Sequence, residues 1–241
     1  MKLGIFTDSH YSTAEITCGR RYNSRSAAKI GEAYRAFGAA GCELVLCLGD
    51  LIDTETAHET ERENLSLCAD IIRAGGIPTL CMMGNHDAFA FTREEFYAVL
   101  GEEMRPPFHL TANDGMSHLF FADACYFSSG KPYAPGDSDW TDTFFPGTDA
   151  LKTALETVDG SGSAYLFLHQ DLDPDISPDH CLSNAAEVRE ILEQSGVVRA
   201  VFAGHYHPGH DSIHAGIQYR TFPAMCERDG REMERYWIVE I

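Results

Sequence analysis

The chain has 241 residues, of which 44% are hydrophobic and 23% charged, a composition typical of an ordinary globular protein, so we expect residues 1–241 to form a single domain. Its formal net charge of −19 repels phosphate backbones, so we expect no nucleic-acid polymer as a partner unless cations are built into a site. No apolar stretch approaches the roughly 20 residues of a membrane helix, so we expect no membrane partner and a cytoplasmic location. The eight cysteines are scattered without a C-x-x-C pair, so we expect reduced, buried thiols.

The first half of the chain predicts strands that alternate with helices. Apolar runs predict strands at 2–7, 43–48 and 77–83, and helical periodicity predicts helices at 24–40, 58–74 and 92–100. The last of these helices follows Thr92, with Glu95 three residues later, the pattern of a capping box. This alternation indicates an α/β core with much parallel pairing.

The second half predicts more strands and one helix. The strands are expected at 118–124, 164–168, 198–203, 217–222 and 235–241. The helix is expected at 184–195, with Asn184 as its cap and Glu187 at the matching position. Because these strands are crowded, we expect them to form a second, more antiparallel sheet. The predicted fold is α/β, with two packed mixed sheets flanked by helices in a four-layer αββα sandwich.

The segment 126–149 fits neither a helix nor a strand. It is rich in Gly, Pro, Ser and Asp, with aromatic residues between them. A loop of this length in a compact domain is usually functional or mobile. Two interpretations remain open: a surface loop pinned by Trp140 and Phe144, or a lid over a site.

Polar side chains follow the predicted strands where those strands end. They are Asp8, His10, Asp50, Asp53, Asn85, His86, His169, His205 and His207. The carboxyl ends of strands in an open α/β sheet meet at one edge, so we expect these residues to converge. Oxygen and imidazole donors without thiolate suit Mn²⁺, Fe or Zn²⁺ in an open catalytic site. Two ions about 3.5–4 Å apart need a bridging carboxylate and terminal ligands, and this set contains both.

These residues stand in motifs that resemble the calcineurin-like metallophosphoesterase superfamily over nearly the whole chain. The motifs are Asp8-x-His10, Gly49-Asp50-x-x-Asp53, Gly84-Asn85-His86-Asp87, His169 and Gly204-His205-x-His207. The resemblance implies one ion on Asp8, His10 and His207, a second on Asn85, His169 and His205, and Asp50 as the bridge. The three glycines are expected where the backbone turns sharply or approaches the ions.

The resemblance also implies the chemistry of the site. Two divalent ions, with manganese preferred and iron or zinc as alternatives, would share a hydroxide that attacks phosphorus. His86 would be the general acid, Asp53 would orient it, and Asn85 would contact the substrate as well as a metal. Asp87 is either a second-shell partner or a helix cap. His210 and His214 either join the cleft or are a chance excess.

The substrate is predicted from a basic segment and from a second resemblance. Arg20, Arg21 and Arg25 in "CGRRYNSRSAAK" either bind a second phosphate or form a solvated helix start. This segment and 126–149 resemble the manganese-dependent ADP-ribose/CDP-alcohol diphosphatase branch. We therefore expect a small phosphodiester or nucleoside diphosphate derivative, with Tyr22, Tyr126, Tyr133 or Trp140 as base-stacking candidates.

Other functions remain as alternatives. A 3′,5′-cyclic nucleotide phosphodiesterase matches the Asp-x-His and Gly-Asn-His-Asp motifs equally well. A protein phosphatase is disfavoured because Thr54 and Asp87 stand where that group carries arginine and glutamate. A scaffold without metals is disfavoured because the ligand set is complete. The sequence makes no prediction of the oligomeric state.

Overall fold

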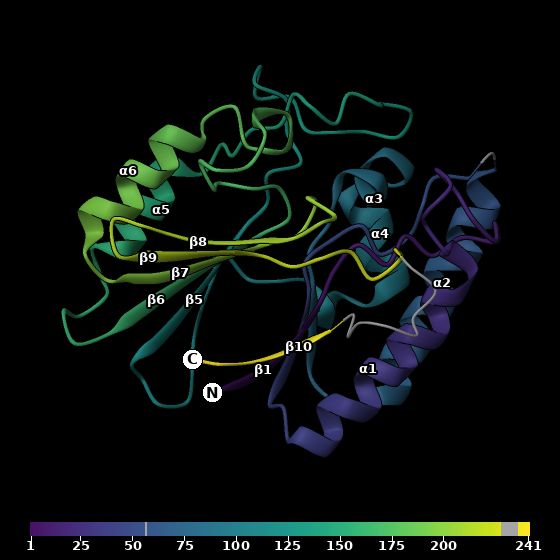
Figure 1. The fold of residues 1–241 in the computed structure, drawn as a ribbon, viewed down its shortest axis with the longest axis horizontal. Helices are drawn as coiled ribbons and strands as arrows, with labels where there is room; N and C mark the ends of the chain where they lie inside the picture. Colours follow the sequence, from purple (N-terminus) through teal and green to yellow (C-terminus); the bar gives the residue numbers. More distant parts are fainter. Residues whose placement is uncertain (56, 228–235) are drawn as a thin grey trace.

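The computed structural model describes residues 1–55, 57–227 and 236–241. Two β-sheets pack against each other, and helices cover their outer faces (Figure 1). The four-stranded sheet has the order β10-β1-β2-β3 and the six-stranded sheet the order β4-β5-β6-β7-β9-β8. This arrangement confirms the predicted α/β fold of two mixed sheets flanked by helices.

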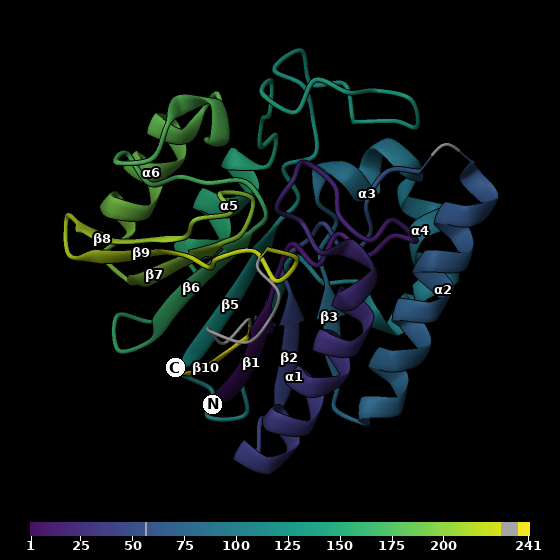
Figure 2. The same ribbon diagram turned by 45° about the vertical axis from the view of Figure 1, so that its right-hand side comes forward.

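The four-stranded sheet contains the first three strands and the last one. Its bounds are β1 Lys2–Phe6, β2 Leu44–Cys47, β3 Thr79–Cys81 and β10 Trp237–Glu240. β1, β2 and β3 are parallel, whereas β10 runs antiparallel to β1. The helices on this side of the molecule are α1 Ser26–Ala40, α2 His58–Gly75, α3 Asn85–Ala90 and α4 Arg93–Leu100 (Figure 2).

The six-stranded sheet is parallel in its centre and antiparallel at both edges. Its strands are β4 His109–Thr111, β5 Ser117–Ala122, β6 Ser163–Leu168, β7 Val198–Ala203, β8 His210–His214 and β9 Ile217–Thr221. The helices α5 Thr148–Leu155 and α6 Ala185–Ser195 pack on its outer face (Figure 1). Three short 3₁₀ turns complete the elements: Asn23–Arg25, Glu102–Met104 and Pro178–His180.

The core lies in layers because side chains of a strand alternate between its two faces. Leu3 and Ile5 of β1 enter the cluster between the two sheets, where Phe121, Phe167 and Phe202 of the second sheet meet them. The neighbouring Phe6 belongs instead to the cluster under α1 and α2. A third cluster fills the space between the six-stranded sheet and α5 and α6. Both faces of each sheet are therefore buried over their central strands.

Most predicted elements are present, with ends shifted by one or two residues. The Thr92–Glu95 capping box is confirmed. The side-chain cap at Asn184 is wrong, because its amide instead accepts from the backbone N–H of Phe145 at 3.1 Å and donates to the Phe145 carbonyl at 2.9 Å. The predicted strand 235–241 is present as β10, and its first residue lies outside the described residues.

The second sheet is only slightly more antiparallel than the first, with two antiparallel pairs of five against one of three. Its central pairs β5–β6, β6–β7 and β7–β9 are all parallel, and only the edge pairs β4–β5 and β8–β9 are antiparallel. Parallel neighbours need a crossover, and α5 and α6 supply the first two crossovers. We missed α5 because it begins inside the segment 126–149, and α3 and β4 because they are short. We missed β8 because its sequence, His-Asp-Ser-Ile-His, contains a single apolar residue.

The loop 126–149 is irregular up to α5 and is held by residues other than those predicted. Tyr133 is buried and donates to the carbonyl of Asp142 at 2.7 Å, and the buried Thr143 donates to that of Ala124 at 2.9 Å. Phe145 is buried, whereas Trp140 is 37% exposed. The predicted anchors Trp140 and Phe144 are therefore less buried than Tyr133, Thr143 and Phe145.

All eight cysteines are free thiols, seven of them buried and Cys18 exposed, so the prediction of core thiols holds for all but one. Within the described residues, no helix combines the length and the apolar character needed to cross a bilayer.

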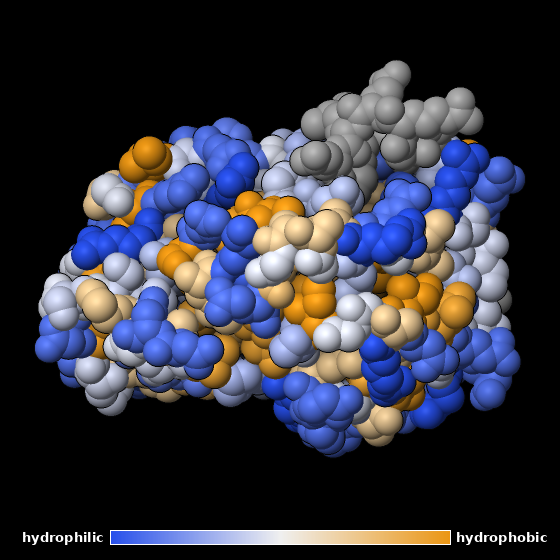
Figure 3. Space-filling view, turned by 90° about the horizontal axis from the view of Figure 1, so that it is seen from below, coloured by the Kyte–Doolittle hydropathy of each residue, from blue (hydrophilic) through white to orange (hydrophobic). Residues whose placement is uncertain are grey.

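On the face opposite the 126–149 loop, hydrophilic and hydrophobic residues are interspersed (Figure 3).

Candidate metal centre

The polar residues that follow the strands converge at one edge of the two sheets. Asp8 and His10 come directly after β1, and Asp50 comes after β2. Asn85 is the first residue of α3, after β3, and His169, His205 and His207 follow β6 and β7. The carboxyl ends of parallel strands share an edge, and this brings residues from both sheets together.

A first group of donor atoms lies within the spacing of a single ion. His207 Nε2 lies 3.4 Å from Asp8 Oδ1 and 3.1 Å from His10 Nε2. His10 Nε2 lies 3.7 Å from Asp8 Oδ1 and 3.4 Å from Asp50 Oδ2. Donors that each sit about 2.0–2.2 Å from one ion in tetrahedral geometry are about 3.3–3.6 Å apart. These four side chains therefore fit one divalent cation.

A second group shares one atom with the first. His169 Nε2 lies 3.3 Å from Asp50 Oδ2 and 3.2 Å from Asn85 Oδ1. His205 offers a nitrogen within 4.8 Å of both Asp50 and His169. Asp50 Oδ2 thus stands next to His10 of the first group and His169 of the second, which is the position of a bridging ligand.

Buried donor atoms without a partner show that the set fits cations. Asp8 Oδ1 and His205 Nε2 are buried and accept or donate no hydrogen bond within the described residues. His169 donates from Nδ1 to the carbonyl of Leu48 at 2.8 Å, and His207 Nδ1 lies 2.7 Å from Glu227 Oε1. These bonds place the proton on Nδ1 and leave the Nε2 lone pair facing the centre, as metal-binding histidines require.

The two buried carboxylates make this site strongly negative. Burial alone would raise the pKa of Asp8 and Asp50, but the neighbouring histidines lower both pKa values below their usual range. Burial likewise would lower the pKa of His169, yet the Asp50 carboxylate raises it to about 9. The same field attracts divalent cations, which compete with protons for these donors.

Four of the ligand-type residues have unusual backbone geometry. The φ angles are 51° at Asp8, 40° at His10, 51° at Asp50 and 64° at His205. Positive φ is uncommon for residues other than glycine, although Asp and His tolerate it better than most. Each strand therefore ends in a sharp turn that directs its side chain into the centre.

Glycine is required where two of these turns approach each other. Gly49 has φ 106°, and a Cβ atom on it would lie 2.6 Å from Nδ1 of His169. A Cβ atom on Gly84 would overlap the carboxylate of Asp50. A larger residue at either position would displace a metal-type donor.

His86 stands beside the centre and contacts a carboxylate. Its Nδ1 lies 2.8 Å from Asp53 Oδ1, and its ring centroid lies 4.5 Å from that of His10. Burial lowers the pKa of His86, but the Asp50 and Asp53 carboxylates outweigh burial and raise this pKa above its usual value. Because Nδ1 is bound to Asp53, the imidazole is oriented with Nε2 available for another partner.

Asp53 is itself held by residues that the sequence did not indicate. Asn23 Nδ2 donates to Asp53 Oδ2 at 2.8 Å and to the His10 carbonyl at 2.7 Å. The Thr17 hydroxyl donates to the same carboxylate oxygen at 3.3 Å. Asn23 and Thr17 come from the segment between β1 and α1, and no spacing in the sequence relates them to Asp53.

A cavity of about 330 Å³ opens over the two donor groups. Its walls are formed by Arg20, Arg21, Asp50, Asn85, His86, Trp140, His180, His205, Tyr206, His207 and Pro208. Arg20 and Arg21 line it as expected of phosphate-binding residues, whereas Arg25 lies outside this lining, 3.8 Å from Glu15 and over the ring of Tyr22. Of the four base-stacking candidates, only Trp140 is among the lining residues.

His180 and Glu227 are further residues of the site that sequence reasoning missed. His180 belongs to none of the motifs named above, but its ring lies 5.2 Å from that of Trp140 and 5.4 Å from that of His205. Glu227 holds His207 and also pairs with Arg20 Nε at 3.0 Å. Cys226, next to Glu227, has its sulfur within 4.8 Å of donor atoms of His10 and His207. No sequence motif pointed to these residues.

Asp87 caps α3 and also holds the loop after β2. Its fully buried carboxylate accepts from the backbone N–H of Gly84 at 3.0 Å, of Leu51 at 3.1 Å and of Ile52 at 3.1 Å. Both open interpretations thus apply, because Asp87 caps the helix that begins with Asn85 and fixes the turn that carries Asp50. Burial and the Asp50 charge together raise the pKa of Asp87 to about 7.

Replacement of Asp87 by alanine should lower the free energy of unfolding by about 3 kcal/mol or more, because three buried N–H groups lose their acceptor at about 1–3 kcal/mol each. Urea denaturation of the metal-free protein measures this loss. Asp114→Ala is the control, since Asp114 also accepts from two backbone N–H groups, of Met116 and Ser117, but at an exposed turn. A loss no larger than that of the control would contradict the role given to Asp87.

His210 and His214 do not line the cavity. Both belong to β8, and their Nε2 atoms face Asp173, at 3.9 Å and 3.6 Å. They therefore form a group of their own, away from the cavity described above.

Comparisons with known proteins agree with this geometry. A family model described as calcineurin-like phosphoesterase matches residues 1–209. No curated protein matched the sequence. Among solved structures, a dimetal phosphatase from Danio rerio is similar with a TM-score of 0.84 and 17% identity, covering 99% of this chain and 91% of that one. The phosphopantetheinyl hydrolase of Mycobacterium tuberculosis has a TM-score of 0.57 and 14% identity, covering 99% and 95%. At these identities the likeness shows the fold alone.

Proposed function

The chain belongs to the calcineurin-like phosphoesterase family of metal-dependent phosphoester hydrolases, and from this premise we propose that its substrate is a small phosphodiester or a nucleoside diphosphate derivative of the ADP-ribose or CDP-alcohol type. The observation that carries the proposal is the cavity wall. Two guanidinium groups and an indole ring surround the same space as the donor atoms of the metal centre. Such a wall offers contacts to a second phosphate and to a planar base.

The proposed cofactors are two divalent cations, with manganese preferred, held by Asp8, His10 and His207, by Asn85, His169 and His205, and by Asp50 between them. When bound, they would supply positive charge for phosphate oxygens and lower the pKa of an attacking water. The oxygen and imidazole donors suit manganese, and the nearby Cys226 sulfur leaves zinc and iron as alternatives.

His86 is the proposed general acid of the reaction. Asp53 orients the ring through Nδ1, so the proton to be transferred is on Nε2, toward the cavity that His86 lines. The Asp50 and Asp53 carboxylates raise the pKa of His86, which favours the protonated ring that a general acid needs. A proton donated to the leaving oxygen matters most for a poor leaving group such as an alkoxide.

Arg21 is the residue we propose for the second phosphate. Its side chain is 18% exposed, and its Nε is buried with no hydrogen-bond partner within the described residues. Its Nη1 lies 4.0 Å from Asp53 Oδ1, too far for a strong bidentate pair. An unsatisfied guanidinium donor at the cavity supports recognition of an anionic group beyond the one at the metals.

Trp140 is the residue we propose for the base or another planar group. Its ring lies 5.5 Å from the ring of His205 and 5.2 Å from that of His180. At 37% exposure it keeps a surface open for stacking.

The proposed location of the protein is the cytoplasm. The seven buried free thiols of the chain support it, because such thiols stay reduced there.

A substrate comparison tests the proposed function. Purified, manganese-loaded protein is assayed with ADP-ribose, a CDP-alcohol, 3′,5′-cyclic AMP and bis(4-nitrophenyl) phosphate. The proposal expects the highest kcat/KM for one of the two diphosphates. A much higher value for cyclic AMP would assign the cyclic nucleotide activity instead, and no hydrolysis of any compound would favour a non-catalytic scaffold.

Arg21→Ala should lower kcat/KM for ADP-ribose by about 10–100-fold, the value of one lost hydrogen-bonded charge contact. Hydrolysis of bis(4-nitrophenyl) phosphate should change by less than about 3-fold, because this substrate has no second phosphate and does not use the contact that the variant removes. Steady-state kinetics on both substrates separates recognition from damage to the metal centre. Arg25→Ala is the matched control, because Arg25 comes from the same segment but lies outside the cavity lining. Equal losses on both substrates would remove Arg21 from second-phosphate binding.

A further inference from the structure

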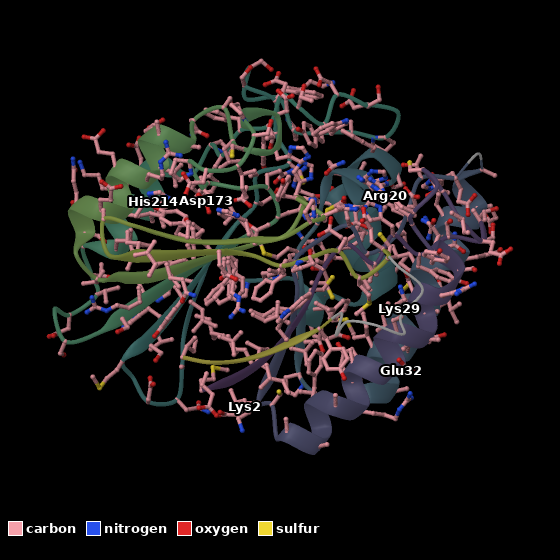
Figure 4. All side chains as sticks on the ribbon, viewed as in Figure 1. Lys2, Arg20, Lys29, Glu32, Asp173 and His214 are labelled. Carbon is pink, nitrogen blue, oxygen red and sulfur yellow. The ribbon has the colours of Figure 1, made fainter. Side chains whose placement is uncertain are left out.

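A second cluster of metal-type side chains lies at the edge of the six-stranded sheet. Asp173 and Asp175 belong to the segment that follows β6, and His210 and His214 belong to the edge strand β8. Residues two apart in a strand share a face, so both histidines point to the same side. Figure 4 shows Asp173 and His214 next to each other beneath α6, on the other side of the molecule from Arg20.

Three of these side chains offer donor atoms close enough together for a single ion. His214 Nε2 lies 3.1 Å from Asp175 Oδ2 and 3.6 Å from Asp173 Oδ1. His210 Nε2 lies 3.9 Å from Asp173 Oδ2, and Asp173, Asp175 and His210 each offer a donor within 4.8 Å of the others. His210 and His214 are four residues apart in β8, so their Cα atoms lie about 13 Å apart and the two imidazoles cannot both reach one ion. Asp173, Asp175 and His210 are the three side chains that can share an ion.

The charge of Asp173 lacks a permanent counter-charge. Its side chain is 0% exposed, and its hydrogen bonds come from neutral donors, the Ser212 hydroxyl at 2.7 Å and the Asp175 N–H at 2.9 Å. Within the described residues, no lysine or arginine forms an ion pair with it. A buried carboxylate needs a compensating positive charge, and two imidazoles supply one only when protonated.

A buried hydroxyl without a partner lies in the same place. Tyr219 of β9 stands directly opposite Ser212 of β8, and cross-strand pairs share a face of the sheet. Its ring lies 5.8 Å from that of His214. The Tyr219 side chain is 1% exposed, and its hydroxyl has no hydrogen-bond partner within the described residues. A water on a bound ion would give this hydroxyl a partner.

We propose that Asp173, Asp175 and His210 bind one further divalent cation of the zinc type, separate from the dinuclear centre. Two carboxylates and one imidazole leave the fourth position of a tetrahedral ion to a water. The ion joins the segment after β6 to the edge strand β8. The ion would therefore hold in place the segment that follows His169 and the segment that follows His207, two residues of the metal centre.

Zinc stoichiometry tests the proposal on the whole chain. Wild-type protein and the variant His210→Ala are stripped with a chelator, dialysed against buffered Zn²⁺ and analysed for bound metal. The wild type should bind one equivalent more than the variant, whose dinuclear ligands are unchanged. Asp211→Asn is the matched control, because Asp211 lies on the same strand, faces the opposite side and pairs with Arg220. It should bind as much zinc as the wild type.

Thermal unfolding gives a second readout. In chelator, the His210→Ala variant should melt close to the wild type, and added Zn²⁺ should raise the melting temperature of the wild type further than that of the variant. Should this variant fail to fold, Asp175→Asn replaces it, and it should weaken the last zinc equivalent by at least about 10-fold. Equal stoichiometry in wild type and variants, or the same loss in Asp211→Asn, would overturn the proposal.

Discussion

Replacement of Asp50 by alanine is expected to abolish tight binding of both metal ions and to reduce phosphoester hydrolysis by roughly 10³-fold or more, because each ion supplies several kcal/mol of charge stabilisation in the transition state. Asp50 Oδ2 lies 3.4 Å from His10 Nε2 and 3.3 Å from His169 Nε2, so one carboxylate serves both donor groups. Metal analysis of the purified variant, together with its turnover of bis(4-nitrophenyl) phosphate, measures the effect.

Two further variants make this result specific. Asp50→Asn keeps the size of the side chain and an oxygen that can accept from the N–H of His86, which now donates to Asp50 Oδ1 at 2.8 Å, but it removes the charge. It should fold like the wild type and still lose metal. Asp123→Ala, which removes an exposed carboxylate paired with Arg93, should keep both ions. Two tightly bound ions in Asp50→Ala would contradict the bridging role.

Replacement of His86 by alanine should instead leave metal content unchanged and reduce turnover by roughly 10²–10⁴-fold on a substrate with a poor leaving group. The loss should be far smaller on bis(4-nitrophenyl) phosphate, because 4-nitrophenolate leaves without a proton. The reason is geometric: His86 is oriented by Asp53 at 2.8 Å and lines the cavity over the metal centre. Kinetics on an alkyl and a nitrophenyl phosphodiester, with metal analysis, measures both parts.

Thr54→Val is the matched control for this variant. The Thr54 hydroxyl lies 3.4 Å from Nδ1 of His86 but is not the partner that orients the ring. It should change turnover by no more than a few-fold, the value of one weak hydrogen bond. If His86→Ala loses the same factor on both leaving groups, His86 does not act as a general acid.

The sequence predicted the elements and the ends of the strands well because both depend on local patterns. Apolar runs of four to six residues predicted β1, β2, β6 and β7, and the donor residues stand directly after them. Parallel strands bring these ends to one edge of each sheet, and the packing of the two sheets brings the two edges together. This is why Asp8, Asp50, His169 and His205 meet in space although they are far apart in sequence.

What the sequence did not predict depends on long-range contacts. Asn23, Glu227 and His180 reach the site from loops whose course no local pattern determines. The crowding of the later strands suggested antiparallel neighbours, yet β5 and β6 are parallel because α5, which was not recognised, forms the crossover between them. Asn184 stands at a cap position, yet a tertiary contact with Phe145 uses its side chain instead. In each case a distant segment overrides the local preference.

The left-handed backbone at Asp8, His10, Asp50 and His205 lowers the stability of the fold at four positions that also carry proposed metal donors. A non-glycine residue held there costs about 1 kcal/mol or more relative to glycine. Glycine at these positions would relax the backbone and at the same time remove four of the proposed metal donors.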